Sequence, residues 1–331
     1  MNLVRILIAF LLSSIIVSCE NPYAGEGDYD EYWICSINID DSDLNYHYKF
    51  DEGNISLELY FTPDYSKVIY NCRWNGLISR NLDGSDSLKL ITNCIPNAHI
   101  SISPDCLKIT YDKFDIFILN INGQNHKNLT NSSFFEHHPK FSTDSKFIIY
   151  TGKIDTITNR VSISMIDFNG NLVADIIGSS LDSVSNYYYN NLYIHPNGNK
   201  IYYTTSDSQL CAVNIDGTDN EILFKGHLSN ASLSFSEDGT KAVFTTNRKI
   251  YLINEYNEII DLETNGYSAT ISNNGEKIIY SYNNDLMIMN NDGSNKNYLT
   301  KGIYGHFYQD DLKIYFIGIK TIHASCDFPN C

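Results

Sequence analysis

The sequence is poor in basic residues. It has 23 Lys and Arg against 39 Asp and Glu, a formal net charge of −16 at pH 7 over 331 residues. Nucleic-acid affinity comes mainly from clustered Lys and Arg that neutralise phosphates, so we expect no nucleic-acid partner. The 43% hydrophobic and 13% aromatic content is nevertheless enough to bury a large core, which excludes a disordered acidic chain.

Common catalytic motifs are also missing. The sequence has no Gly-x-Ser-x-Gly elbow, no His-Glu-x-x-His pair and no phosphate-binding loop. These motifs would place a nucleophile, a zinc ion or a nucleotide. We therefore assign no catalytic residue, no cofactor and no metal ligand from motifs.

No apolar run is long enough to cross a membrane, which takes about 20 residues. The longest is the twelve-residue run 6–17, which follows Arg5 and ends in Ser18-Cys19. A short apolar run behind a positive charge is typical of a secretory signal peptide. Residues 16–19 (Ile-Val-Ser-Cys) resemble the bacterial lipobox. The resemblance implies that residues 1–18 are removed and that Cys19 becomes the lipidated (palmitate-bearing) first residue.

Residues 19–31 then form an acidic segment without apolar periodicity, which we interpret as a tether between the lipid and the folded domain. Glu20, next to the lipid site, differs from the Asp of inner-membrane retention signals. We therefore expect a lipoprotein of the bacterial cell envelope, at the outer membrane, facing either the periplasm or the medium.

A repeated pattern occupies the rest of the chain. Each copy has a short alternating strand, a Pro/Asp/Asn/Gly turn, and a Lys that opens a strand rich in Ile, Val and Tyr, as hairpins require. Copies occur at residues 60–70, 101–111, 140–150, 193–203, 234–244, 270–280 and 307–316.

A second turn, most often Asn-x-Asp-Gly, follows most of the hairpins. These turns begin at residues 81, 120, 167, 214, 254 and 290. Their spacing of about 40 residues fits a four-stranded propeller blade. At these residues the chain resembles the TolB-type, WD40-like PD40 repeat family, and the resemblance covers residues 32–320. It implies an all-β protein that folds as a β-propeller.

The ends of the repeat region indicate how the ring closes. Residues 32–43 match the second half of a unit, and residues 307–320 supply only a first half. We predict that the N-terminal strands complete the last blade and leave no open sheet edge. This gives seven blades, with six as the alternative because the proteins that give the family its name have six. Residues 321–331 form a tail that contains cysteines.

Functional residues are expected in the loops of one end of the ring. This end, here called the upper face, carries the loops between the second and third strands and between successive blades. The two longest departures from the repeat, residues 151–160 and 178–191, both fall there, and insertions on one face of a repeat array commonly mark a binding surface. The candidate partner-binding residues of this face are Arg73, Trp74, His99, Phe114, His138, Tyr187, Tyr188 and Tyr189.

His99 and His138 hold equivalent repeat positions, five residues before the Pro position, and both are expected at the upper mouth of the central channel. Imidazoles from adjacent blades can bind a metal, and the similar propellers of oligogalacturonate lyases use histidines in this way. The equivalent positions in other units hold Glu58, Asn191, Ser232, Ser268 and Tyr304. A third imidazole must therefore come from His306 or His137.

Seven cysteines remain after Cys19, and export would permit disulfides. Cys35 could pair with Cys326 or Cys331 across the ring closure, and Cys72 with Cys94. Two function classes therefore follow. The first is a non-catalytic envelope lipoprotein that is held at the membrane by its N-terminal lipid and binds a protein or glycan with the propeller's upper face. The second is a propeller enzyme that cleaves polysaccharides with channel histidines and a metal.

Overall fold

The residues that the structure describes form 27 β-strands. The structure, a computed structural model, describes residues 29–50, 55–72, 76–92, 98–153, 161–178, 189–205, 208–226, 232–309 and 311–322. These residues contain no helix, and among them nothing helical is long and apolar enough to cross a membrane. The predicted all-β propeller is confirmed.

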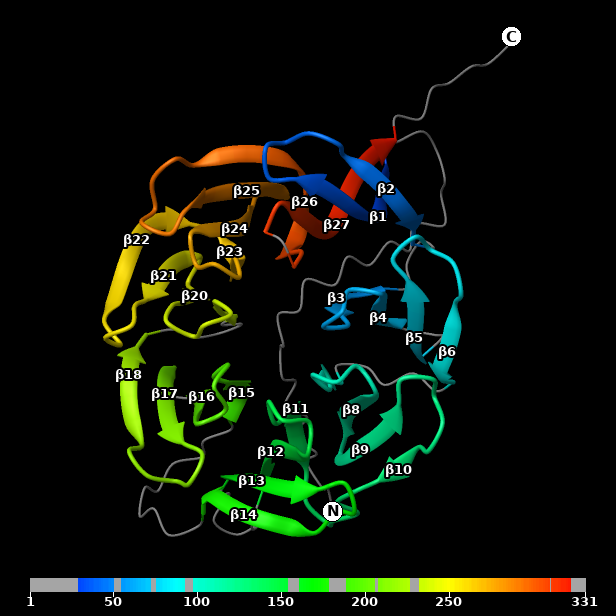
Figure 1. The fold of residues 1–331 in the computed structure, drawn as a ribbon, viewed down its shortest axis with the longest axis vertical. Coiled ribbons are helices and arrows are strands. Elements are labelled where there is room, and N and C mark those ends of the chain that lie inside the picture. The colour runs from blue at the N-terminus through cyan, green and yellow to red at the C-terminus, as the bar shows by residue number, and fades with distance from the viewer. Residues whose placement is uncertain are drawn as a thin grey trace, which may run out of the picture.

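Five four-stranded antiparallel sheets and one seven-stranded sheet surround a common axis (Figure 1). The first sheet comprises β3 (Ile55–Phe61), β4 (Lys67–Cys72), β5 (Gly76–Asn81) and β6 (Leu88–Ile91). The second comprises β7 (Ile100–Ile102), β8 (Lys108–Lys113), β9 (Asp115–Asn120) and β10 (Lys127–Asn128). The third comprises β11 (Glu136–Phe141), β12 (Phe147–Lys153), β13 (Val161–Asp167) and β14 (Leu172–Ile177). The fourth comprises β15 (Tyr189–Ile194), β16 (Lys200–Thr205), β17 (Gln209–Asn214) and β18 (Glu221–Lys225). The fifth comprises β19 (Leu233–Phe235), β20 (Ala242–Thr246), β21 (Lys249–Ile253) and β22 (Ile259–Asn265).

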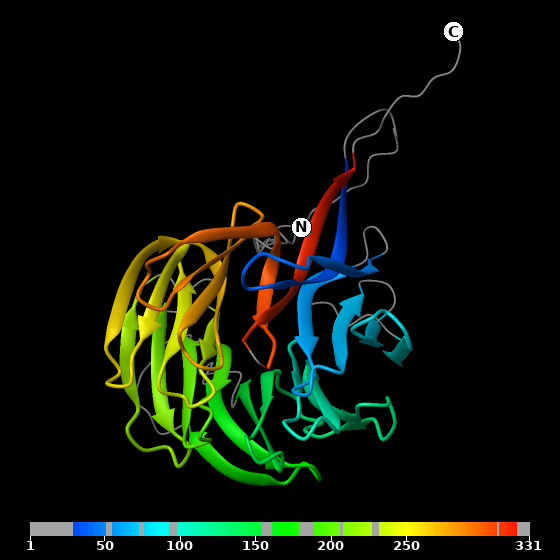
Figure 2. The ribbon, with the colours of Figure 1, turned by 45° about the horizontal axis from the view of Figure 1, so that its top comes forward.

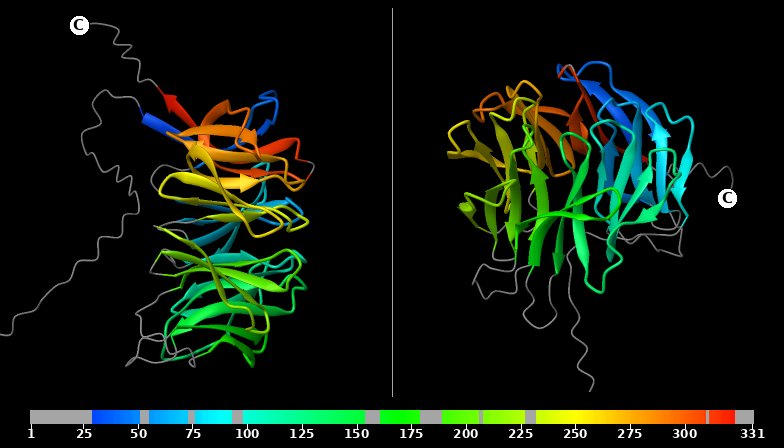
Figure 3. Two further views of the ribbon diagram at one scale, coloured as in Figure 1. Left: turned by 90° about the vertical axis from the view of Figure 1, so that its left-hand side faces the viewer. Right: turned by 60° about the horizontal axis from the view of Figure 1, so that its bottom comes forward.

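The seven-stranded sheet has the order β2-β1-β27-β26-β25-β24-β23. Its strands are β1 (Tyr29–Asn38), β2 (Asn45–Lys49), β23 (Tyr267–Ile271), β24 (Lys277–Tyr282), β25 (Asp285–Asn290), β26 (Asn297–Phe307) and β27 (Lys313–Ile322). In each sheet the first strand along the repeat lies nearest the axis, as β3, β11, β15 and β23 show, and the fourth lies at the periphery (Figure 1). Seen edge-on, the strands run between the two ends of the ring (Figure 3).

The turns form where the repeat predicts them. In the unit of β5, the Gly84 amide donates to the Asn81 carbonyl oxygen at 2.9 Å, and Oδ1 of Asp83 accepts from the Ser85 amide at 2.9 Å. Gly84 has φ +86°, a conformation that glycine adopts without steric cost. The Lys67 ammonium that opens β4 donates to Oδ1 of Asn81 at 2.7 Å. These side chains thus join the two hairpins of this repeat at the lower face, the end opposite to the upper face, and Lys277 and Asn290 do the same at 2.7 Å.

The ring closes through a strand pair made from both ends of the chain. β1 runs antiparallel to β27 with continuous register from Tyr29 opposite Ile322 to Asn38 opposite Lys313. Figure 2 shows the two strands side by side, extending together beyond their neighbours. The predicted pairing of the N-terminal segment with the C-terminal half-unit is confirmed.

The strand begins earlier than the expected tether boundary at residue 31. Residues 29–31 pair with residues 320–322, and the acidic side chains there have partners. Oδ1 of Asp30 accepts from the Thr321 hydroxyl at 2.7 Å, and Glu31 forms an ion pair with Lys49. The sequence alone predicts a solvated acidic segment, because it does not show these partners.

The core lies between adjacent sheets. Branched aliphatic side chains of the central strands are fully buried there, together with aromatic residues such as Tyr70, Tyr111 and Phe244. Burying such side chains contributes roughly 1.5–3 kcal/mol each. The strand tyrosines therefore serve packing in most sheets.

Candidate functional site: the upper mouth of the channel

The innermost strands carry β-bulges near the upper face. The register of β11 shifts between His137 and Lys140 where it pairs with β12, and His138 has φ +54°. A bulge leaves backbone groups of the inner strand without a ladder partner. The equivalent position of the second strand is a buried polar residue in most units, and its side chain can satisfy these groups. These residues are Asn71, Asp112, Thr151, Thr204, Thr245 and Ser281.

Asp112 in β8 is the one acidic member of that set, and it organises the site. Its Oδ1 accepts from the His99 amide at 2.6 Å, and its Oδ2 accepts from the His138 amide at 3.0 Å. Nδ1 of His99 donates to Oδ2 at 2.8 Å, and Nδ1 of His137 lies 3.4 Å from the same oxygen. One buried carboxylate of β8 therefore binds the segment at His99, just before β7, and the start of β11, and it fixes the tautomer of His99.

The two histidines predicted to converge do so. The ring centroids of His99 and His138 lie 3.7 Å apart, and His137 follows at 6.2 Å from His138. His137 thus supplies the third imidazole. His306 lies elsewhere, against Phe61 with ring centroids 5.2 Å apart.

Burial, hydrogen bonds and neighbouring charges set the pKa values of Asp112 and His138. Burial alone would raise the pKa of Asp112, but hydrogen bonds from His137 and His99 outweigh it and hold that pKa well below its ordinary value. Burial and the neighbouring His99 lower the pKa of His138 far below its usual range. At neutral pH the site therefore holds an ionised Asp112 and an uncharged His138. The His99 and His137 side chains, 37% and 44% exposed, face solvent.

Two exposed aromatic rings adjoin the histidines. Phe114, between β8 and β9, is 63% exposed, and Phe135, just before β11, is 53% exposed. Their ring centroids lie 5.3 Å apart, and Phe135 stacks on His137 at 6.4 Å. Phe114 has φ +68°, and its carbonyl oxygen accepts from the Glu136 amide at 2.8 Å. We call Phe114, Phe135, His99 and His137 the upper patch.

The remaining predicted residues are only partly placed. Arg73, Trp74, Tyr187 and Tyr188, as well as Cys19, lie outside the described residues. Tyr189 begins β15, but its side chain falls outside them too.

Of the predicted disulfides, the structure shows Cys35 as a free thiol rather than bonded to Cys326 or Cys331, and the Cys72–Cys94 pair stays a prediction. Cys35 is fully buried in the closing sheet, and burial raises its thiol pKa to about 12. Cys326, Cys331, Cys94 and the side chain of Cys72 lie outside the described residues.

Sequence reasoning did not identify Asp112 or Phe135. Asp112 could have been found, because an acid interrupts a strand position at which the other units have short neutral polar or apolar side chains. Phe135 lies in a connecting segment that varies between units and carries no comparable signal. Among the described residues, no group of three or more His, Cys, Asp or Glu is arranged to hold a metal ion.

The fold is shared with several solved propellers. An oligogalacturonate lyase in complex with manganese aligns at TM-score 0.62 and 12% identity, over 90% of this chain and 99% of that one. A putative TolB from Agrobacterium tumefaciens aligns at TM-score 0.52 and 17% identity, over 89% and 99%. In fold, the protein is a β-propeller similar to these two. An oligogalacturonate lyase from Vibrio parahaemolyticus aligns with this chain at TM-score 0.60 and 11% identity, over 89% and 98%. No protein-family model and no curated protein sequence matches the chain.

Proposed function

We propose that this TolB-like propeller is a lipoprotein of the cell envelope, anchored at the outer membrane through Cys19. Its upper patch binds a protein or a glycan, and it catalyses no reaction. The lipobox-like residues 16–19 and the lack of a longer apolar run support lipid anchoring.

The exposure of the upper patch carries the binding proposal. Two phenylalanines face solvent side by side, although burying each would be favourable by roughly 1.5–3 kcal/mol. Phe114 also keeps a left-handed backbone conformation that is uncommon for a bulky side chain. Neither feature contributes to the core between the sheets. Exposed aromatic clusters of this kind mark interaction surfaces, and strain is commonly kept at functional sites.

A ring of seven blades fits the strand pairing best. β26 pairs with β25 over residues 297–301 and with β27 over residues 302–307. One long strand therefore serves as the outer strand of one blade and the inner strand of the next. The seven-stranded sheet then contains two blades, in addition to the five four-stranded sheets.

The similar fold of an oligogalacturonate lyase solved with manganese favours a second candidate, a metal-dependent enzyme acting on polysaccharide. His99 and His138 would be its channel histidines. The described donors do not fit a bound metal as they are arranged, because both Asp112 oxygens and Nδ1 of His99 already bond to one another or to the backbone. Binding without catalysis is therefore the function we propose.

Cross-linked affinity capture from intact envelopes tests the proposal. We expect the double variant Phe114→Ala, Phe135→Ala to recover at least about tenfold less partner than the natural protein, since central aromatic residues of interfaces contribute about 2 kcal/mol or more. Tyr256→Ala is the control, because Tyr256 is 75% exposed on the lower face. Equal recovery by the double variant would refute the upper patch.

Two further measurements test the lipid anchor and the alternative that the protein is an enzyme. Mass spectrometry of the mature protein should find a lipid on Cys19, and its absence would refute the anchor. An eliminative or hydrolytic activity on polysaccharide that His138→Asn abolishes, with the fold retained, would favour the enzyme instead.

A further inference from the structure

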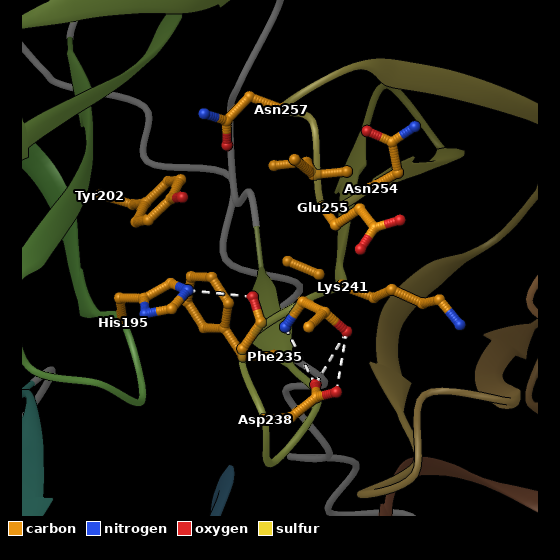
Figure 4. A pocket seen from close by; sticks show the side chains of 12 residues that line it. His195, Tyr202, Phe235, Asp238, Lys241, Asn254, Glu255 and Asn257 are labelled. Atoms are coloured by element: carbon orange, nitrogen blue, oxygen red, sulfur yellow. Dashed lines mark hydrogen bonds between the residues drawn. The ribbon is translucent and has the colours of Figure 1, made fainter.

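A cavity of about 250 Å³ opens on the lower face, between the sheet of β15–β18 and the sheet of β19–β22. Three rings form its wall. The ring centroids of Tyr202 and Phe235 lie 5.1 Å apart, and the His195 ring lies 5.3 Å from Phe235. Figure 4 shows these rings on one side and Glu255 and Asn257, from the turn after β21, on the other.

The Tyr202 hydroxyl is directed into this cavity (Figure 4). The residue is only 4% exposed, yet its hydroxyl forms no hydrogen bond with any residue that the structure describes. Both nitrogens of His195, by contrast, have partners. Nε2 donates to the Gly239 carbonyl oxygen at 2.9 Å, and Nδ1 accepts from the Asn197 amide at 3.3 Å. The hydroxyl is accessible from the cavity, so a ligand hydroxyl that enters it can form a hydrogen bond there.

The interface between the closing sheet and the sheet of β3–β6 repeats this arrangement. Tyr308, Tyr315 and Phe61 hold the positions of His195, Tyr202 and Phe235, because the turn bonds and strand registers correspond. There the space is filled by Tyr65, whose ring lies 5.8 Å from Phe61 and 5.1 Å from Tyr308. The Tyr65 hydroxyl donates to the Phe307 carbonyl oxygen at 2.6 Å.

Gly239 replaces Tyr65 in the lower-face cavity. A Cβ at Gly239 would lie 2.7 Å from Nε2 of His195, so no side chain can enter from this position. The same aromatic wall therefore occurs twice in the protein. At the closing sheet the Tyr65 ring packs against it, whereas at the lower-face cavity no described side chain covers it. The internal copy indicates that the open wall accepts a six-membered ring with a hydroxyl group.

The rim of the lower-face cavity is more polar than the rim of the interface that Tyr65 fills. Glu255 and Asn257 stand where the filled copy has Leu82 and Gly84, and the turn bonds of the two segments correspond. The side-chain amide of Asn257, which is exposed, makes no hydrogen bond with the described residues. A ring with several hydroxyl groups would satisfy these polar side chains, whereas a phenol has only one. Because Glu255 and Asp238 are acidic and Lys241 donates to the Gly275 carbonyl oxygen at 3.3 Å, an anionic sugar would be disfavoured.

We propose that this cavity binds a neutral pyranose ring, stacked on the aromatic wall and hydrogen-bonded by Tyr202, Asn257 and Glu255. Aromatic wall and convergent polar groups are the usual elements of a small-ligand site. The site lies at the opposite end of the ring from the upper patch, so either proposal can fail without the other.

Saturation-transfer NMR of the whole protein tests this site with methyl β-glucopyranoside, methyl β-galactopyranoside and methyl α-mannopyranoside, each up to about 20 mM. We expect at least one to bind with a Kd near about 1 mM, which is typical of a single small ring. Tyr202→Phe keeps the wall and removes the hydroxyl, so the affinity should fall about fivefold. Asn257→Gly, the residue found in most of the other turns, should weaken binding about threefold.

Tyr315→Phe is the matched control, because it removes the corresponding hydroxyl at the filled interface, and its affinity should equal that of the natural protein. No saturation transfer to any of the three glycosides would overturn the proposal, and so would unchanged binding by Tyr202→Phe. N-acetyltyrosinamide is tested in parallel. Its binding in place of the glycosides would identify a partner's phenolic side chain as the ligand and would also overturn the sugar site.

Discussion

Gly318→Ala tests the closure of the ring. Gly318 in β27 lies against the buried thiol of Cys35 in β1, and a Cβ at this position would overlap Sγ and approach the Cys35 Cβ to 3.4 Å. Both residues are buried, and the opposing backbone is held by the β1–β27 register. Overpacking of this kind costs typically 1–3 kcal/mol, so we expect the free energy of unfolding to fall by about 2 kcal/mol.

Combining Gly318→Ala with Cys35→Ala tests the contact between the two residues directly. Cys35→Ala alone should cost about 1 kcal/mol, because it removes one buried sulfur atom. It also removes the atom that the Gly318→Ala methyl group meets, so the double variant should cost about 1 kcal/mol in total. The coupling between the two positions is then about 2 kcal/mol in favour of the pair.

Urea unfolding under reducing conditions, followed by tyrosine and tryptophan fluorescence, measures these differences. Additive effects of Gly318→Ala and Cys35→Ala would refute the reasoning. They would mean that the two side chains are not neighbours, and that β1 does not pair with β27 in the register described.

Three other outcomes follow from the structure. Gly170→Ala should cost more than about 2 kcal/mol in urea unfolding, since Gly170 has φ +90° and its new methyl group would overlap the Leu129 carbonyl. Gly178→Ala should cost less than about 0.5 kcal/mol, since its new methyl group would only touch the Asp175 Cβ at 3.8 Å. The pKa of His138 is lowered in the folded state. The free energy of unfolding that depends on His138 should therefore be constant above about pH 6.5 and fall by up to about 1.4 kcal/mol per pH unit below it. His138→Asn should reduce that slope, and an unchanged pH profile would contradict the neutral, buried imidazole. Tyr65→Phe should lower the free energy of unfolding by about 1 kcal/mol through its lost hydrogen bond to β26, and a thermal midpoint equal to that of the natural protein would argue against that bond.

The repeat made most of the fold predictable. An Asn-x-Asp-Gly turn specifies its own hydrogen bonds and a positive φ, so each copy forms the same local structure wherever it occurs. The Lys that opens the second strand and the Asn of the second turn are also recognisable, because they bond to each other, as Lys67 and Asn81 do. The pairing of β1 with β27 could be inferred because each end of the chain carries half of a unit.

The site was less predictable, because it depends on contacts between units. Equivalent repeat positions brought His99 and His138 together correctly. Nothing in the residues near Asp112 shows that its carboxylate accepts hydrogen bonds from the next unit. The lower-face cavity was missed for a similar reason. It exists because Gly239 follows a unit that carries Tyr202, and each residue alone fits the repeat.

The strand pair that closes the ring also determines how the molecule bears load. Tension applied at the chain start would act along β1, whose backbone bonds to β27 lie perpendicular to that direction. Ten residue pairs would then resist together in shear, instead of opening one after another from an end. A propeller held by its first residues can therefore be pulled by its attachment without being unwound.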